Sequence, residues 1–241
     1  MRIGISLAQC GRLARPAAVT AAARAAEQLG YSSVWVCDSV LDPAGVLAAT
    51  ASITSRVRLG AYVSLPSVSD PETLARALAT VDVLSEGRLC VVLTGQDGRA
   101  DRVLDALGSL DVPVLLDGTS PSSLDLVARR ADGWGPTGLP VPAIAPLWAK
   151  VRDLAAAWGR DPDELQLVVR AGIVLHDRAV EGTRPSWHGD AEQVADDVER
   201  TRGMGADEVV FRLTGDLGLD EALDGYARIA EAAELRAVQM R

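Results

Sequence analysis

Short apolar and β-branched runs alternate along the chain with longer segments in which apolar residues recur at helical spacing. This alternation is typical of repeated βαβ units, in which helices cover a parallel sheet. Eight strand-like runs can be counted, and the sixth is the weakest of them. They span residues 3–7, 33–36, 58–63, 88–93, 113–116, 133–135, 167–174 and 208–213.

The helical segments between these runs carry recognisable start and stop signals. Asp42-Pro43, Asp70-Pro71 and Ser120-Pro121 each place a capping side chain before a proline, whose missing N–H costs nothing at the first helical position. Gly30 and Gly205 lie where helices should end, just before the second and eighth strands. The boundaries between strands and helices are therefore well marked.

An open, doubly wound sheet would show the same alternation, so periodicity alone does not close the sheet. Eight βα units are, however, the number in a TIM (β/α)₈ barrel, and 241 residues is an ordinary length for one. No linker or low-complexity segment divides the chain. The pattern predicts an α/β protein with one domain, residues 1–241, folded as a closed barrel.

Composition narrows the range of partners. The net charge of −9, from 24 basic and 33 acidic side chains, repels nucleic acids and anionic lipid surfaces. Cys10, Cys37 and Cys90 are odd in number and lack metal-ligand spacing, so we expect free thiols, no metal site and a reducing compartment. The start of the chain does not resemble an export signal, and no apolar run is long enough to cross a membrane. We therefore expect a cytoplasmic protein.

The functional residues of such barrels lie at the carboxyl ends of the strands and in the loops that follow. Gly118, Thr119 and Ser120 stand between the fifth strand and a helix start, where backbone N–H groups and hydroxyls could hold a phosphate. An ordinary helix cap with a glycine turn would look the same. Thr94-Gly95-Gln96 forms a second glycine-containing loop after the fourth strand, and it is the weaker signal.

Four further side chains at strand ends are candidates for chemistry. Asp38 and Ser39 follow the second strand, where a carboxylate could orient a ligand or simply brace the loop. His176 follows the seventh strand and could transfer protons, although a lone histidine more often has a structural role. Tyr62, in the third strand, could stack on a bound ring or belong to the core.

Several segments resemble the bacterial luciferase-like monooxygenase superfamily, and above all its methylenetetrahydromethanopterin reductase and other deazaflavin-dependent branches. The most specific block is Ala-Thr-Val-Asp-Val-Leu-Ser-Glu-Gly-Arg at 79–88. Similar segments occur at 25–39, 54–60, 71–76, 128–134, 189–194 and 203–210, in the family's order. The resemblance covers most of the chain.

The resemblance implies a barrel that is often a homodimer and that holds coenzyme F-420, a deazaflavin, or FMN at its mouth. The cofactor phosphate would lie near the fifth and sixth strands, on Gly118 to Ser120, and the ring near Asp38, Tyr62 and Gln96. The family often has a non-proline cis peptide in the third strand, which maps to Tyr62-Val63 and would form a shelf for the cofactor. A deazaflavin transfers hydride, so the resemblance implies an oxidoreductase acting on a small organic substrate.

Two departures from the family pattern leave a second function open. Many relatives have a histidine directly after the aspartate of the second strand, where this chain has Ser39. The segment between Leu93 and Pro113 is also much shorter than in full-length relatives, so part of the substrate pocket should be missing. The alternative is therefore a shortened, non-catalytic barrel that binds a flavin, or no cofactor, and acts as a binding protein.

Overall fold

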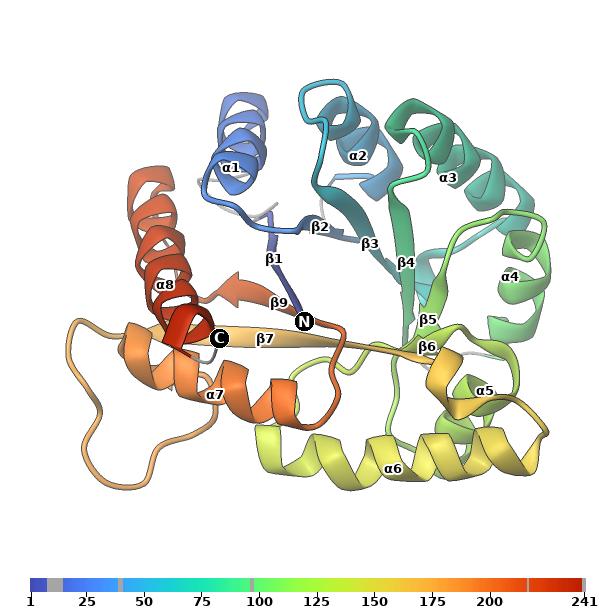
Figure 1. The fold of residues 1–241 in the computed structure, drawn as a ribbon. Helices are drawn as coiled ribbons and strands as arrows, with labels where there is room; N and C mark the ends of the chain where they lie inside the picture. The colour runs from blue at the N-terminus through green and yellow to red at the C-terminus, as the bar shows by residue number, and fades with distance from the viewer. Residues whose placement is uncertain (8–14, 39–40, 96–97, 216, 240–241) are drawn as a thin grey trace.

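The computed structural model describes residues 1–7, 15–38, 41–95, 98–215 and 217–239, with the backbone alone at Pro16 and at 234–239. Strands alternate with helices, and the helices surround the strands (Figure 1). The strands are β1 (Arg2–Ser6), β2 (Ser33–Cys37), β3 (Arg58–Ser64), β4 (Leu89–Thr94), β5 (Val114–Leu116), β6 (Gly133–Trp134), β7 (Gln166–Leu175), β8 (His188–Gly189) and β9 (Glu208–Leu213). The α-helices are α1 (Pro16–Gln28), α2 (Pro43–Ala51), α3 (Pro71–Ser85), α4 (Ala100–Leu107), α5 (Pro121–Arg130), α6 (Val141–Ala157), α7 (Ala191–Gly203) and α8 (Leu219–Gln239). The 3₁₀ turns are η2 (Leu65–Ser67) and η3 (Pro162–Glu164).

The sheet closes into a barrel. Its strand order is β6-β5-β4-β3-β2-β1-β9-β7, all pairings are parallel, and a further pairing of β6 with β7 joins the two ends. The short β8 pairs only with the far end of β7, so eight strands form the wall. The predicted barrel is confirmed, and the open sheet is excluded. The connection from β4 to β5 holds only the 8-residue helix α4, as the short segment after Leu93 predicts.

The sixth strand, β6, is only 2 residues long, and a steric constraint explains why its sequence signal is weak. A Cβ at Gly133 would collide with the backbone of Gln166 on the neighbouring β7. Only glycine lets the two strands approach closely enough to pair there. The strand that closes the barrel is therefore also the one whose composition least resembles a strand.

The capping signals act as predicted. Asp42 accepts a hydrogen bond from the Gly45 N–H at 2.8 Å, and Asp70 accepts one from the Thr73 N–H at 3.1 Å. Because an N-cap side chain satisfies an N–H group that the helix leaves free, these contacts fix where α2 and α3 begin. Gly30, just after α1, has φ +84°, a backbone conformation that glycine adopts without strain.

Side chains alternate between the barrel interior and the layer of helices, as parallel strands buried on both faces require. The apolar interior is small. It consists of Trp35, Tyr62, Cys90, Val92, Leu115, Val168 and Val210. Gly60 provides the room for the Trp35 indole, since a Cβ at Gly60 would overlap the indole ring.

A buried carboxylate closes the lower end of the barrel. Glu208, at the start of β9, is 0% exposed and accepts hydrogen bonds from Trp35 Nε1 at 2.8 Å and from the Ser33 hydroxyl. Arg2 and Arg58 form ion pairs with it at 3.2 and 3.4 Å. This end carries the amino termini of the strands, where such groups serve stability rather than chemistry.

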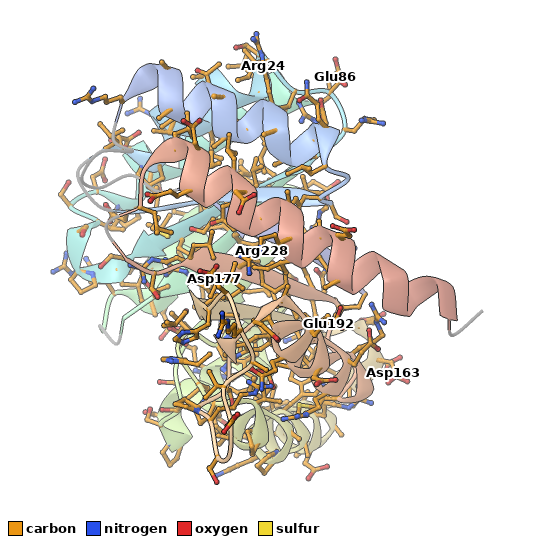
Figure 2. The ribbon with its side chains drawn as sticks, turned by 90° about the vertical axis from the view of Figure 1, so that its left-hand side faces the viewer. Arg24, Glu86, Asp163, Asp177, Glu192 and Arg228 are labelled. Atoms are coloured by element: carbon orange, nitrogen blue, oxygen red, sulfur yellow. The ribbon has the colours of Figure 1, made fainter. Side chains whose placement is uncertain are left out.

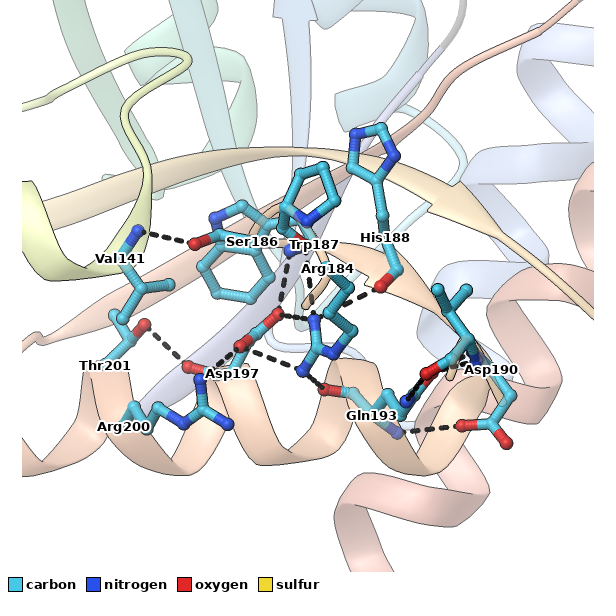
Figure 3. A network of polar contacts seen from close by, with 12 residues as sticks. Val141, Arg184, Ser186, Trp187, His188, Asp190, Gln193, Asp197, Arg200 and Thr201 are labelled. Atoms are coloured by element: carbon cyan, nitrogen blue, oxygen red, sulfur yellow. Dashed lines mark hydrogen bonds and ion pairs between the residues drawn. The ribbon is translucent and has the colours of Figure 1, made fainter. Parts of the chain in front are cut away.

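The long connection between β7 and α7 is fastened to α7 by a second buried carboxylate (Figure 3). Asp197 is 0% exposed and pairs with Arg184 at 2.7 Å and with Arg200 at 3.2 Å. It also accepts the backbone N–H of Trp187 at 2.7 Å. Trp187 has φ +67°, which is costly for a bulky side chain, so this connection is held by specific contacts.

Three smaller expectations can be compared with the described residues. Cys37 and Cys90 are free thiols, as predicted, and Cys10 lies outside the described residues. The expected cis peptide at Tyr62-Val63 is wrong, because every peptide bond described is trans. In the described part of the chain, no helix is both long and apolar enough to cross a membrane.

Candidate functional site

An arginine crosses the barrel at its upper, carboxyl end. Arg170 projects inward from β7, and its guanidinium carbon lies 4.7 Å from the centroid of the Tyr62 ring on β3. Four strand-to-strand steps separate β7 from β3 in either direction, so the two residues come from opposite walls. Arg170 Nη2 also donates a hydrogen bond to Cys37 Sγ on β2 at 2.7 Å.

The polar atoms of this cluster are incompletely satisfied. Arg170 Nε and the Tyr62 hydroxyl are buried and have no hydrogen-bond partner within the described residues. No described carboxylate lies within 4 Å of the Arg170 guanidinium. Burial raises the pKa of Tyr62 well above its ordinary range, against the opposing charge of Arg170. Tyr62 is therefore a neutral hydrogen-bond donor at physiological pH.

Tyr62 belongs to the interior in this structure. It is 2% exposed, and its ring contacts both the Arg170 guanidinium and Trp35, with ring centroids 4.9 Å apart in the latter pair. A ligand entering the mouth would meet Arg170 before it met the Tyr62 ring. Val63, the next residue, is 4% exposed and faces the helix layer.

The turn after β5 has the geometry of a capped helix start. Gly118 has φ +135°, a conformation that disfavours any other residue. The Ser120 hydroxyl accepts the Ser123 N–H at 3.1 Å, and the Gly118 carbonyl accepts Trp134 Nε1 at 2.9 Å. Thr119 is exposed between them. The predicted capping role is thus present, and an anion at the same helix start remains a proposal.

A cavity of about 500 Å³ lies beside this turn, between the ends of β4 and β5 and the helices α4 and α5. Gly95 lines it, and so do the hydroxyl-bearing Ser122 and Ser123 and the cation Arg129. Three carboxylates, those of Asp101, Asp117 and Asp125, line it as well. The cavity has the size of a small-molecule site, and its charge is mixed.

Asp117 links the cavity to the barrel mouth. Its Oδ1 accepts the Gly118 N–H at 2.7 Å. Burial raises the pKa of this carboxyl group, and the Gly118 N–H and the positive charge of Arg170 partly offset that effect. The positive charge of Arg170 therefore lowers the pKa of Asp117, although the two described side chains form no ion pair.

The loop after β4 brings two candidate residues to the same rim. The Thr94 hydroxyl donates to the Val63 carbonyl at 3.4 Å. Gly95 has φ +85°, and a Cβ there would approach Pro66 Cδ to 3.0 Å, so the position requires glycine. Gln96 lies outside the described residues.

Asp38 occupies a different recess. Its N–H donates to the Tyr62 carbonyl at 2.8 Å, and its side chain lines a cavity of about 200 Å³ between the ends of β2 and β3 and the helices α2 and α3. Val63 lines the same cavity. Asp38 and Val63 are thus brought together, apart from Gly118 and its neighbours. Ser39 lies outside the described residues.

His176 is not part of the cluster around Arg170. It lies six positions further along the chain, which corresponds to about 20 Å of extended strand. Its side chain is exposed, and its carbonyl accepts Arg228 Nη2 at 3.0 Å. Figure 2 shows Arg228 beside Asp177, with which it forms an ion pair at 3.1 Å. The geometry favours a surface position for this histidine.

Sequence reasoning missed Arg170, Cys37 and Asp117 as residues of the mouth. One signal was available for Arg170, because it is the only charged residue within the otherwise apolar run of β7. An ionised side chain in a strand buried on both faces needs a reason. Cys37 and Asp117 directly follow the predicted second and fifth strands, so their place at strand ends was the signal available for them.

A closed parallel barrel with a polar cluster at its carboxyl end is an architecture shared by many enzyme families. A model of one of them, described as luciferase-like monooxygenase, matches residues 1–105 and 96–184 of this chain. The chain belongs to the luciferase-like monooxygenase family.

Curated relatives match over short segments. An uncharacterized protein of Mycobacterium tuberculosis is 51% identical over 51 residues, which is 21% of this chain and 18% of that protein. The 5,10-methylenetetrahydromethanopterin reductase of Methanopyrus kandleri is 32% identical over 79 residues, 32% of this chain and 23% of that enzyme. The matched segments thus span less than a quarter of these relatives.

Solved structures resemble the whole barrel. Monooxygenase RslO1 from Streptomyces bottropensis has a TM-score of 0.77 at 19% identity, covering 98% of this chain and 100% of that one. The coenzyme F420 dependent tetrahydromethanopterin reductase from Methanopyrus kandleri has a TM-score of 0.78 at 15% identity, covering 98% and 99%. At these identities the similarity establishes the fold.

Proposed function

We propose that this chain is a flavin- or deazaflavin-dependent oxidoreductase that transfers hydride to or from a small organic substrate at the barrel mouth. The observation that carries the proposal is the cavity of about 500 Å³ at the ends of β4 and β5, in a chain of this family. Two of the matched proteins, the reductase of Methanopyrus kandleri and a secondary alcohol dehydrogenase, are described as F420-dependent. Coenzyme F-420 is accordingly our first candidate cofactor, and FMN is the second.

The residues around the cavity fit the phosphate of such a cofactor better than its ring. The start of α5 offers a positive helix end together with the hydroxyls of Ser122 and Ser123, which suit a phosphate. Asp101 and Asp125 lie in the same cavity and would repel an anion placed near them, and Asp117 would have to release the Gly118 N–H to an anion bound at the turn. We therefore place the phosphate at the Gly118 to Ser120 turn.

The ring belongs, in this proposal, over the centre of the mouth, near Asp38, Tyr62 and Gln96. When bound, the cofactor would supply the hydride chemistry. Tyr62 would act as a neutral hydrogen-bond donor, because burial keeps its hydroxyl protonated. Asp38 would orient the ring or the substrate, while roles for Ser39 and His176 in proton transfer rest on the family pattern alone.

The second candidate is a barrel that binds a ligand without turnover. The 8-residue helix α4 favours it, since little chain is left between β4 and β5 to cover a substrate. The two candidates predict different behaviour once the cofactor is bound. An enzyme should bleach the F-420 or FMN absorption when given a hydride donor, whereas a binding protein should leave the spectrum unchanged.

We also propose a cytoplasmic homodimer. Val83 and Leu84 near the end of α3 are 76% and 55% exposed, side by side in the family's most specific block. Apolar side chains exposed together are costly unless a partner covers them. A second copy of this chain is the partner that the family pattern suggests.

The test is a titration of the purified protein with F-420 and with FMN, followed by fluorescence. Ser122→Asp should weaken cofactor binding by about tenfold or more, because it adds negative charge at the phosphate position. The same change should not destabilise α5, since an acidic side chain in the first turn favours a helix. Ser122→Asn is the matched neutral control and should bind like the parent.

Each outcome decides something. Equal cofactor affinity in Ser122→Asp and the parent would move the phosphate away from α5. Absence of binding by the parent to either cofactor would overturn the proposed oxidoreductase. Gly118→Val is a poorer probe, because its φ of +135° means that the substitution would strain the turn as well as block an anion.

A further inference from the structure

Arg170 is a cation inside the barrel, and none of the described carboxylates forms an ion pair with it. Its contacts are the face of the Tyr62 ring and the Cys37 sulfur, and its Nε has no hydrogen-bond partner among the described residues. Buried charges in proteins are ordinarily paired. The ion pairs found elsewhere in this chain, such as Arg184 with Asp197, show the ordinary arrangement.

A second unsatisfied donor belongs to the same cluster. The Tyr62 hydroxyl is buried, in a residue that is 2% exposed, and it has no partner among the described residues. A guanidinium offers donors in a planar fork, and the phenol offers one more. The cluster thus contains unpartnered donors on both Arg170 and Tyr62, and such donors suit a ligand whose atoms only accept hydrogen bonds.

Two side chains of the cluster are accessible in part. Arg170 and Cys37 are both partly exposed. The next inward position on β7 is Gly172, where an added Cβ would meet nothing closer than Thr214 Cγ2 at 3.7 Å. β7 therefore places no side chain over the guanidinium.

We propose that Arg170, assisted by the Tyr62 hydroxyl, binds the carboxylate of a small organic acid in the barrel mouth. A carboxylate matches the guanidinium fork in shape and charge, and it accepts hydrogen bonds without donating any. This inference rests on the proposed function only in regarding the acid as the substrate. The anion site itself needs neither cofactor nor turnover.

The position of Cys37 provides a direct test, because its sulfur lies 2.7 Å from Arg170 Nη2. Iodoacetate and iodoacetamide alkylate a thiol by the same step: sulfur attacks the methylene carbon, iodide leaves, and the thiol proton passes to the buffer. Only iodoacetate carries a carboxylate. The ratio of the two rates at Cys37 therefore reports recognition of the carboxylate, and any effect of Arg170 on the thiol itself cancels.

Peptide mass spectrometry of native protein gives both rates, and the urea-unfolded protein gives the reference ratio. We expect the native ratio of iodoacetate to iodoacetamide to exceed the reference by about tenfold or more, with saturation in iodoacetate. Propionate should slow iodoacetate and leave iodoacetamide unaffected. Cys90 serves as an internal control, because it is 1% exposed and burial raises its pKa to about 12.

Variants separate recognition from general charge. Arg170→Gln should return the ratio to the reference, and Tyr62→Phe should lower it while keeping the aromatic ring. Arg24→Gln removes the same charge from the exposed surface of α1, visible in Figure 2, and should leave the ratio unchanged. Circular dichroism confirms that each variant is folded. An equal ratio in the parent and Arg170→Gln, or no reaction of Cys37 with either reagent, would overturn the proposal.

A final comparison tests whether Arg170 recognises a substrate or the cofactor. If the site serves a substrate, loading the protein with F-420 or FMN leaves the preference for iodoacetate in place. If the cofactor's own anionic ring occupies Arg170, loading abolishes the preference and contradicts the substrate assignment. A protein that binds neither cofactor but retains the preference would refute the proposed oxidoreductase while supporting the carboxylate site.

Discussion

The Arg170 guanidinium lies 4.7 Å from the centre of the Tyr62 ring, although the two residues stand on opposite walls of the barrel. A long, flexible side chain thus spans the interior at the level where ligands of this fold bind. The contact leaves a cation at the mouth that is held by an aromatic face rather than by a carboxylate. Arg170 should therefore contribute less to the free energy of unfolding than the buried ion pairs elsewhere in the molecule, and denaturation experiments can measure this difference.

Arg170→Met should change the free energy of unfolding by no more than about 1 kcal/mol. The substitution loses a cation–π contact worth up to about 2 kcal/mol, and it removes a buried, unpartnered N–H that costs about 1–3 kcal/mol. Urea denaturation followed by tryptophan fluorescence measures the net effect. Tyr62→Ala, at the other end of the contact, should cost about 3–5 kcal/mol because it empties part of the core. A comparably large loss in Arg170→Met would mean that the arginine is a structural core residue.

Glu208→Ala should lower the free energy of unfolding by about 3–5 kcal/mol. The variant leaves Arg2 and Arg58 without their carboxylate and the Trp35 Nε1 donor without one of its acceptors. Glu208→Gln should cost less, because it fills the same volume and still accepts hydrogen bonds. Carboxylate recognition at Cys37 should survive in both folded variants, since Glu208 lies at the opposite end of the barrel. Loss of that recognition in a folded Glu208→Gln would contradict the separation of the two ends.

Asp197→Ala should release the connection between β7 and α7. Arg184, whose side chain is 11% exposed, would lose its carboxylate, and the Trp187 N–H would lose its acceptor. Trypsin should then cut the folded protein after Arg178 about tenfold faster, because local opening becomes more frequent. Arg200→Gln is the matched control, since that side chain is 59% exposed and its pairing with Asp197 contributes little. Equal cleavage of parent and Asp197→Ala would show that other contacts hold the segment.

Asp117→Asn should become progressively more stable relative to the parent as the pH rises. Burial raises the folded-state pKa of Asp117 above its ordinary value of 3.8, so the folded state binds this proton more tightly than the unfolded chain does. The contribution of Asp117 to stability is therefore fully present below pH 3.8 and declines as the pH rises through the folded-state pKa. Asparagine keeps an acceptor for the Gly118 N–H without titrating.

Thermal unfolding of both proteins across this pH range measures the effect. The two melting temperatures should converge at low pH, which provides the internal control for any steric consequence of the substitution. A constant difference at every pH would show that the proton on Asp117 has no part in stability.

The amino-acid sequence by itself determined the βα rhythm, the eight strands and the helix starts at Asp42, Asp70 and Ser120. These features depend on periodicity and on contacts within three residues along the chain, such as Ser120 with Ser123, so local sequence suffices to predict them. The order of family motifs added the closed barrel and the short connection after β4.

Only the tertiary structure decided which side chains share the mouth. Cys37, Tyr62 and Arg170 meet because closure of the sheet places β7 opposite β3 and within reach of β2, and no local pattern contains that information. His176 is the opposite case. Its position directly after a strand predicted that it would lie in the mouth, but its side chain is exposed and lies outside the cluster. β7 is 10 residues long and continues beyond the pairing with β6, so its end carries the histidine away from the cluster. The position of a residue in the sequence determines which strand or helix it belongs to. Strand length and barrel closure determine which side chains surround it.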